Sequence, residues 1–127
     1  MLLILYLQIH MPILGLRKCR ANKKMEQIQF SHWQDESMSA MFPGICFCQL
    51  WQSARGAKAV VVKIEPGGKW QGYDVHESGS EEIFVVEGIF NDGDRSYPAG
   101  TFIHYPQGSR HVPQSETGCL LFVFYPR

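Results

Sequence analysis

The chain has 127 residues, and its 12 Lys and Arg residues balance 12 Asp and Glu residues to a formal net charge of zero. This length is normal for one domain and is enough to bury a sizeable core. Apart from the cluster RKCRANKK at residues 17–24, the basic residues are scattered, which excludes an electrostatic footprint for nucleic acid; we therefore expect no nucleic-acid partner.

The first 24 residues differ from the rest of the chain. Residues 1–16, MLLILYLQIHMPILGL, are apolar, but they are fewer than the ~20 that a membrane-spanning helix needs, and Gln8, His10 and Pro12 interrupt them. The basic cluster follows the apolar run, whereas a signal peptide has the reverse order. We predict that residues 1–24 are an extension outside the fold of a cytoplasmic protein. The alternative is association with a membrane through residues 1–16.

Residues 25–41 are polar with isolated aromatic side chains, and we interpret them as a lead-in with an edge strand or no regular structure. The domain is expected at 42–127, where Gly, Pro and aromatic residues are frequent and helical patterns are scarce. Runs of β-branched and apolar residues predict strands at 45–52, 58–64, 70–76, 81–90, 101–105, 111–113 and 118–125. Turn signals at 42–44, 53–56, 65–68, 78–80, 91–94 and 97–100 separate them. This spacing indicates an all-β sandwich or barrel.

Two of the predicted strands, 81–90 and 118–125, have apolar residues on both alternating faces, so we expect both faces to be covered. A homodimer with sheets packed between the subunits would cover them, and this is the interpretation that we favour. The alternative is that long apolar strands fill the core of a monomer.

The four cysteines, Cys19, Cys46, Cys48 and Cys119, form no CxxC pair. A zinc–thiolate site normally needs two close pairs, and only Cys46 and Cys48 are close. We interpret the cysteines as buried reduced thiols, which fits a reducing compartment.

Four polar residues among the predicted strands are candidate metal ligands. Asp74 and His76 are two residues apart on one predicted strand, so both point to the same face. Glu81 opens the next strand after a turn containing Gly79, and His111 arrives from a distant strand. Two imidazoles and two carboxylates suit one divalent transition metal, Fe(II), Mn(II), Zn(II) or Ni(II), and the absence of thiolates argues against Cu(I).

These residues stand at the spacing of a known pair of motifs. The first has G, five residues, H-x-H, three or four residues, E, six residues, G; the second has G, five residues, P-x-G, two residues, H, three residues, N. The matching positions are Gly68, Asp74, His76, Glu81 and Gly88, then Gly100, Pro106, Gly108 and His111. The chain departs from the pattern twice, with Asp74 in place of the first His and Ser115 in place of the final Asn.

On these motifs the chain resembles the cupins, and the phrases GSEEIFVVEGIFNDGDRSYPAGTF, YPQGSRHVPQS and GCLLFVF are similar to the ChrR-like group. The resemblance covers residues 42–127. It implies a small jelly-roll β-barrel, a double-stranded β-helix, with one metal held inside. It does not extend to the zinc-binding N-terminal half that holds the sigma factor in the protein that names this group. We therefore expect no sigma-factor partner.

The Asp at position 74 affects the expected metal. It adds negative charge and a hard oxygen donor, which favours Mn(II) or Fe(II) relative to a site with three imidazoles. The alternative role of Asp74 is to orient His76 without binding the metal itself. Tyr73, His104 and Phe122 are further candidates, as residues that line the pocket.

Two functions are consistent with such a site. One is a small-molecule binding or regulatory cupin in which four protein ligands occupy the coordination positions of the metal. The other is a metal-dependent dioxygenase that acts on a diketone, a flavonol or a similar enolizable substrate, which the resemblance allows. The sequence contains no Ser–His–Asp arrangement, phosphate-binding glycine loop or dinucleotide fingerprint that would indicate another enzyme class.

Overall fold

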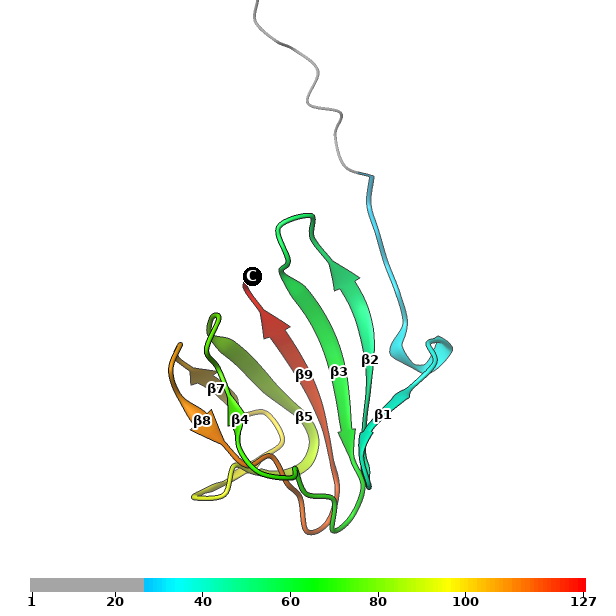
Figure 1. Cartoon of the computed structure of the whole chain (residues 1–127). Coiled ribbons are helices and arrows are strands. Elements are labelled where there is room, and N and C mark those ends of the chain that lie inside the picture. Colours follow the sequence, from blue (N-terminus) through cyan, green and yellow to red (C-terminus); the bar gives the residue numbers. More distant parts are fainter. Residues whose placement is uncertain (1–26) are drawn as a thin grey trace, which may run out of the picture.

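The computed structural model describes residues 27–127 (Figure 1). The extension expected at residues 1–24 lies outside the described residues. Between 27 and 127 the chain forms one short 3-10 helix and nine strands. Their bounds are η1 Trp33–Asp35, β1 Ser39–Phe42, β2 Ile45–Gln52, β3 Lys58–Ile64, β4 Asp74–Val75, β5 Glu81–Asn91, β6 Ser96–Pro98, β7 Phe102–Tyr105, β8 Arg110–His111 and β9 Cys119–Tyr125.

Seven of the strands form one antiparallel sheet. Its order is β1-β2-β3-β9-β5-β6. Strand β7 pairs with the first half of β5, and β6 pairs with the second half of β5. Strands β4 and β8 form a separate antiparallel pair. Figure 1 shows the long strands curving together, with the small pair beside β5 and β7. Among the described residues, backbone pairing does not close the sheet into a continuous barrel. The prediction of an all-β jelly-roll fold is confirmed.

The core lies on the inner face of this curved sheet. Along β5 the buried side chains alternate as Glu81, Ile83 and Val85, which is the period of two that a strand with one buried face shows. Their apolar partners come from β2, β3, β7 and β9 and include Ile45, Ile64, Ile103, Leu121 and Val123. The inner face therefore places one carboxylate, Glu81, among apolar side chains.

The outer face of the sheet has two halves. Over β2, β3 and β9, the buried residues Cys48, Val61 and Leu120 are packed under Trp33 and Met38 of the preceding segment. Over β5, β7 and β9, three aromatic residues remain exposed: Phe84 at 43%, Phe102 at 64% and Phe122 at 36%. Phe84 pairs across the strands with both Phe102 and Phe122. The structure thus covers one half of the outer face with its own chain and leaves an aromatic row on the other.

Most strands fall where the sequence predicts them, and three regions differ. The strand predicted at 111–113 shares only His111 with the observed strand β8. The predicted strand 70–76 is reduced to β4. Trp70 still donates its N–H to the Pro113 carbonyl. Gly72 then adopts a φ of +84° and interrupts the strand pairing. In the region 97–100, predicted as a turn, Tyr97 and Pro98 belong to strand β6 instead. A proline can occupy this edge strand because its missing N–H faces no partner strand.

One glycine in β5 permits close packing of two central strands. Gly88 has a φ of +76°, and a Cβ atom built on it would lie 2.1 Å from the carbonyl oxygen of Gly118, the residue before β9. Any larger residue would force β5 and β9 apart beside a bulge between Val85 and Glu87. Within residues 27–127, no helix is long and apolar enough to cross a membrane.

Candidate metal centre

The β4–β8 pair places two of the candidate ligands side by side. Asp74 and His111 are direct cross-strand partners in this pair. His76 follows β4, and its backbone continues the pairing: its N–H donates to the Ser109 carbonyl at 2.9 Å, and its carbonyl accepts from the Gly108 N–H at 2.8 Å. The tight turn at Gly108, with a φ of +86°, lets the chain return at this point.

Glu81 completes the group from the opposite sheet. It is the first residue of β5, and its side chain is buried on the inner face. Its Oε1 atom lies 3.3 Å from His111 Nε2 and 3.7 Å from His76 Nε2, and His111 Nε2 lies 3.4 Å from Asp74 Oδ2. The four residues offer one ligand atom each within 4.8 Å of one another. They are the one such group found among residues 27–127.

The unpartnered atoms of this group fit a metal ion. His76 Nε2, Glu81 Oε1 and His111 Nε2 are buried, and none has a hydrogen-bond partner among the described residues. Buried polar atoms are nearly always paired, and a metal ion is a partner that all three could share. Ligand atoms about 2.0–2.2 Å from one ion lie about 3–4 Å apart, which matches the 3.3–3.7 Å separations. The donor set suits a divalent transition metal.

The charges of the group act most strongly on His111. Burial alone would lower the pKa of His111, but the Asp74 and Glu81 carboxylates that face it raise the pKa to about 9. Without a metal, the imidazolium of His111 would hold the two carboxylates together. A metal must displace this proton, because imidazole binds metals through an unprotonated nitrogen.

Two residues that the sequence analysis did not single out, Tyr105 and Asp92, support the imidazole of His111. The ring of Tyr105 packs on the imidazole of His111, and the hydroxyl of Tyr105 donates to Asp92 Oδ2 at 3.0 Å. Burial is the largest influence on Asp92 and raises its pKa, but hydrogen bonds from two backbone N–H groups and from Tyr97 and Tyr105 lower it overall. Asp92 is therefore a charged anchor for the ring under His111.

A third residue that the sequence did not single out, Tyr125, lies at the end of β9. It lines a mainly apolar cavity of about 30 Å³ together with Asp74, Glu81 and His111. It also lines an outer groove of about 270 Å³ that reaches Asp74 and His76. Burial and the nearby Glu81 carboxylate raise the pKa of Tyr125 above its ordinary value. Its phenol therefore stays protonated beside the candidate ligands.

The three residues predicted to line the pocket lie elsewhere. Tyr73 is 58% exposed, and the guanidinium of Arg110 covers its ring at 4.2 Å. His104 faces outward and contacts the Glu82 carboxylate at 2.8 Å. Phe122 belongs to the aromatic row on the outer face. None of the three contributes to the cavity or the groove at the ligand group, because the alternation of β5, β7 and β9 turns His104 and Phe122 to the outer face.

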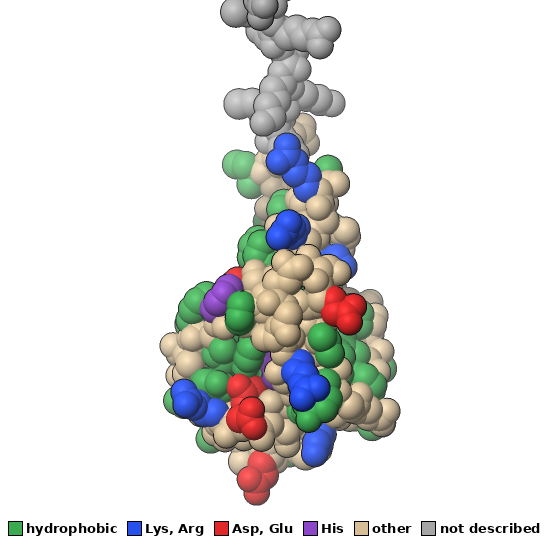
Figure 2. Space-filling view, turned by 60° about the vertical axis from the view of Figure 1, so that its left-hand side comes forward, with side chains coloured by type: hydrophobic (Ala, Val, Ile, Leu, Met, Phe, Trp, Pro, Cys, Tyr) green, Lys and Arg blue, Asp and Glu red, His purple; other side chains and the backbone are tan. Residues whose placement is uncertain are grey.

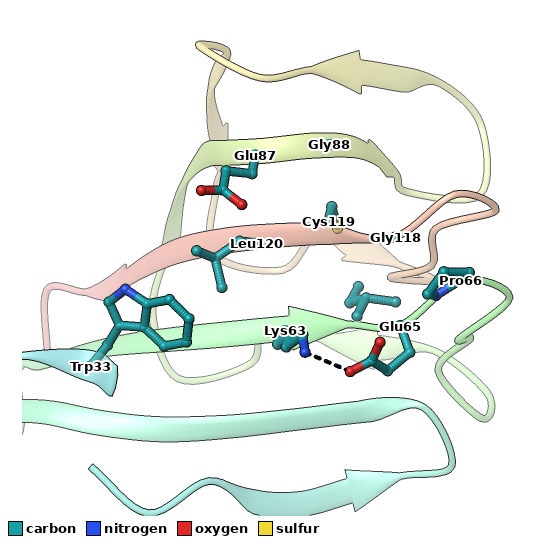
Figure 3. A pocket seen from close by; sticks show the side chains of 10 residues that line it. Trp33, Lys63, Glu65, Pro66, Glu87, Gly88, Gly118, Cys119 and Leu120 are labelled. Atoms are coloured by element: carbon teal, nitrogen blue, oxygen red, sulfur yellow. Dashed lines mark ion pairs between the residues drawn. The ribbon is translucent and has the colours of Figure 1, made fainter. Parts of the chain in front are cut away.

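A separate hollow of about 240 Å³ lies on the outer face of the sheet (Figure 3). It lies between Trp33, Glu87 and Leu120, and the Lys63 and Glu65 side chains at its margin pair with each other at 2.8 Å. The four candidate ligands are not part of it. Figure 2 shows a face on which basic, acidic and hydrophobic side chains are interspersed, without a large patch of one charge.

The comparison with protein families decides the identity of the fold. The family described as the ChrR cupin-like domain matches residues 22–126. The chain belongs to this cupin family. The match begins at residue 22 and so includes the segment that we interpreted as a lead-in. No curated protein matches this cupin by sequence.

Solved structures with this fold are numerous and distant in sequence. A chain in the Rhodobacter sphaeroides complex of SigE with the anti-sigma ChrR is 21% identical, with a TM-score of 0.64 over 74% of this cupin and 50% of that chain. This cupin thus spans half the length of that chain. The polyketide cyclase RemF from Streptomyces resistomycificus is 18% identical, with a TM-score of 0.68 and coverages of 79% and 80%. A protein assigned as an acetylacetone dioxygenase, from Methylibium petroleiphilum, is 13% identical, with a TM-score of 0.70 and coverages of 83% and 81%. At these identities the likeness concerns the fold alone.

Proposed function

We propose that this cupin holds one divalent transition metal, Fe(II), Mn(II) or Zn(II), on Asp74, His76, Glu81 and His111, and that it acts as a small-molecule binding or regulatory protein. The observation that carries the proposal is the group of three buried atoms that face one another without a partner. Leaving them unpaired costs free energy, and a cation offsets that cost for all three together.

The groove beside the ligand group supports binding of a small molecule. Asp74 is the least buried of the four ligands, with 22% of its side chain exposed, and it lines both the cavity and the groove. A molecule in the groove would therefore approach the metal from the side of Asp74 and His76. Glu81 and His111, with only 3% and 2% of their side chains exposed, would hold the ion from the core side.

The second candidate function is a metal-dependent dioxygenase that acts on a diketone, a flavonol or a similar enolizable substrate. The observation that favours it is the apolar wall of the inner cavity, where Trp70, Leu121 and Val123 face the carboxylate and imidazole ligands. Such a wall excludes water from one side of the ligand group, and Tyr125 supplies a protonated hydroxyl on the other. A bound Fe(II) would supply the oxygen chemistry.

We also propose that the protein is a homodimer that pairs through the aromatic row on its outer face. The row Phe102–Phe84–Phe122 runs across three strands to β7, which has a partner on one side only. A second copy supplies the same row, and a two-fold arrangement would cover both at once. The other half of this face is already covered by Trp33 and Met38, so the partner would complete one continuous apolar layer. Sedimentation should show a dimer for the wild type and a monomer for Phe84→Arg; a monomeric wild type would contradict this proposal.

We propose a cytoplasmic location on the basis of the thiols. Cys46, Cys48 and Cys119 are all free, and the last two are buried. Reduced thiols persist in the reducing compartments of the cell. The alternative, association with a membrane through residues 1–16, concerns a segment outside the described residues.

The experiment that tests the metal centre is elemental analysis of the full chain beside two double variants. His76→Ala with His111→Ala removes both imidazole ligands. His32→Ala with His104→Ala removes two exposed histidines and serves as the matched control. We expect near-stoichiometric metal in the wild type and the control, and none in the ligand variant. Absence of metal from the wild type after growth with each metal supplied would contradict the proposal.

The same preparations distinguish the two candidate functions. Stoichiometric zinc without oxygen uptake on diketones or flavonols would support the binding or regulatory function. Stoichiometric iron with substrate-dependent oxygen uptake would support the dioxygenase. In that case the ligand variant should lose the uptake and the control variant should keep it.

A further inference from the structure

We propose that Tyr125 is a positioning residue of the metal centre, whose hydroxyl donates a hydrogen bond to Glu81 and fixes the orientation of that carboxylate toward the metal. This inference rests on the proposed metal binding. It assigns a role to a residue on β9, a strand that contributes none of the four ligands.

The register of the sheet places Tyr125 beside Glu81. Glu82 of β5 is the cross-strand partner of Phe124 of β9. Continuing this antiparallel register by one residue brings Glu81 opposite Tyr125. Because side chains alternate along both strands, Glu81 and Tyr125 share the inner face while Glu82 turns to the outer face. Directly opposed side chains on one face lie in contact range. The backbone therefore holds the phenol next to the carboxylate.

The two oxygens of Glu81 then have different partners. Oε1 is buried, faces the Nε2 atoms of His76 and His111, and has no hydrogen-bond partner, so it is the oxygen that a metal would take. The second oxygen is left for the hydroxyl of Tyr125, which lines the same inner cavity as Glu81. A protonated phenol can only donate to an ionised carboxylate. A carboxylate fixed in this way loses less rotational freedom when it binds a metal.

Tyr125 lies between the inner cavity and the outer groove, so loss of its hydroxyl would also affect how Glu81 is oriented. The residue lines the inner cavity on one side and the outer groove on the other. Without its hydroxyl, Glu81 could turn its free oxygen toward water in the groove. The expected effect is weaker metal binding, since partners that orient metal ligands contribute roughly 10- to 100-fold to metal affinity.

The test is titration of the metal-free full chain with Zn(II) and with Mn(II), for the wild type, Tyr125→Phe and Tyr73→Phe. Tyr73→Phe removes the hydroxyl of an exposed tyrosine and is the matched control. We expect Tyr125→Phe to weaken binding at least tenfold and Tyr73→Phe to leave it within twofold. Thermal unfolding of the metal-free proteins checks that each is folded. Tyr125→Leu supplies a second variant without the hydroxyl if Tyr125→Phe does not fold.

A double-mutant cycle with Glu81→Gln tests whether Tyr125 acts through Glu81. The loss caused by Tyr125→Phe should disappear in the Glu81→Gln background. An undiminished affinity of Tyr125→Phe, or an equal loss in both backgrounds, would overturn the role of Tyr125 while leaving the metal centre intact. A wild type that binds neither metal would overturn the proposed metal centre, and the role of Tyr125 with it.

Discussion

The ring of Tyr105 lies 4.1 Å from the imidazole of His111, centroid to centroid, with the two planes inclined by 35°. The Tyr105 hydroxyl is in turn fixed to Asp92, which also accepts from Tyr97 at 2.8 Å. A chain of contacts thus runs from the loop between β5 and β6 to a proposed metal ligand on β8. Tilted ring packing of this kind restricts the rotation of the imidazole, so His111 is oriented by aromatic packing.

Removal of the Tyr105 hydroxyl tests this support. Tyr105→Phe keeps the ring under His111 and deletes its hydrogen bond to Asp92, and hydrogen bonds to charged groups contribute about 1.5–3 kcal/mol. We expect the free energy of unfolding in urea to fall by about 1–3 kcal/mol. Tyr73→Phe, on an exposed ring, should leave it within about 0.5 kcal/mol. Equal stabilities of the two variants would contradict the anchoring role of Asp92.

The metal-free protein should lose stability as the pH rises. The folded-state pKa of His111 is raised to about 9 from an ordinary value of 6.5 by Asp74 and Glu81, despite burial. A raised folded-state pKa stabilises the folded protein fully below the ordinary pKa, and this contribution disappears as the pH rises through the folded-state value. We expect the free energy of unfolding to decline between pH 6.5 and pH 9, relative to His111→Asn. Parallel pH profiles for the wild type and this variant would exclude the effect.

Asp74 can be tested as a ligand because the neighbouring groove offers a control carboxylate. Glu77 lines the same groove but is not a member of the ligand group. We expect Asp74→Asn to weaken Mn(II) binding at least tenfold and Glu77→Gln to change it little, because only the first removes a charged oxygen donor. Asp74→His should retain binding and favour Zn(II) over Mn(II). The same affinity in Asp74→Asn and Glu77→Gln would leave Asp74 with the role of orienting His76.

The closeness of β5 and β9 can be tested at Gly88. Gly88→Ala would place a Cβ atom 2.1 Å from the Gly118 carbonyl oxygen, so we expect a loss of more than ~3 kcal/mol or a failure to fold. Gly72→Ala is the matched control: its φ of +84° is also positive, but no atom lies within 4 Å of the added Cβ. It should cost only the backbone strain, about 1–2 kcal/mol. Urea unfolding measures both, and comparable losses would contradict the steric argument.

Local sequence patterns were sufficient to predict much of the fold and the composition of the candidate site. The runs ICFCQLWQ and KAVVVKI became β2 and β3 with the predicted bounds, because β-branched and apolar residues between clear turns favour strands. Asp74, His76, Glu81 and His111 were predicted as one group from their spacing, and the structure brings them together. That they bind a metal stays a prediction.

The supporting residues could not be predicted, because their roles depend on register. Tyr105 and Tyr125 stand in apolar strands and have the pattern of ordinary core residues. Only the pairing of β5 with β7 and β9 places both beside Glu81. A shift of β7 by one residue would turn Tyr105 outward and His104 inward, and a shift of β9 by one residue would turn Tyr125 outward. Strand β6 was missed for a related reason, since Tyr97 and Pro98 have turn composition and become a strand only by pairing with β5.

Strands β4 and β8 are the shortest elements between residues 27 and 127. Strands β4 and β8 contain two residues each and pair only with one another, yet they provide Asp74 and His111, while Glu81 belongs to the large sheet. An ion bound to all of them would act as a crosslink between the two sheets. It would suppress local opening of the small one, much as a disulfide closes a loop. Amide hydrogens along β4 and β8 would then exchange slowly when the metal is bound and quickly when it is absent. Their exchange rates would therefore report whether the site is occupied.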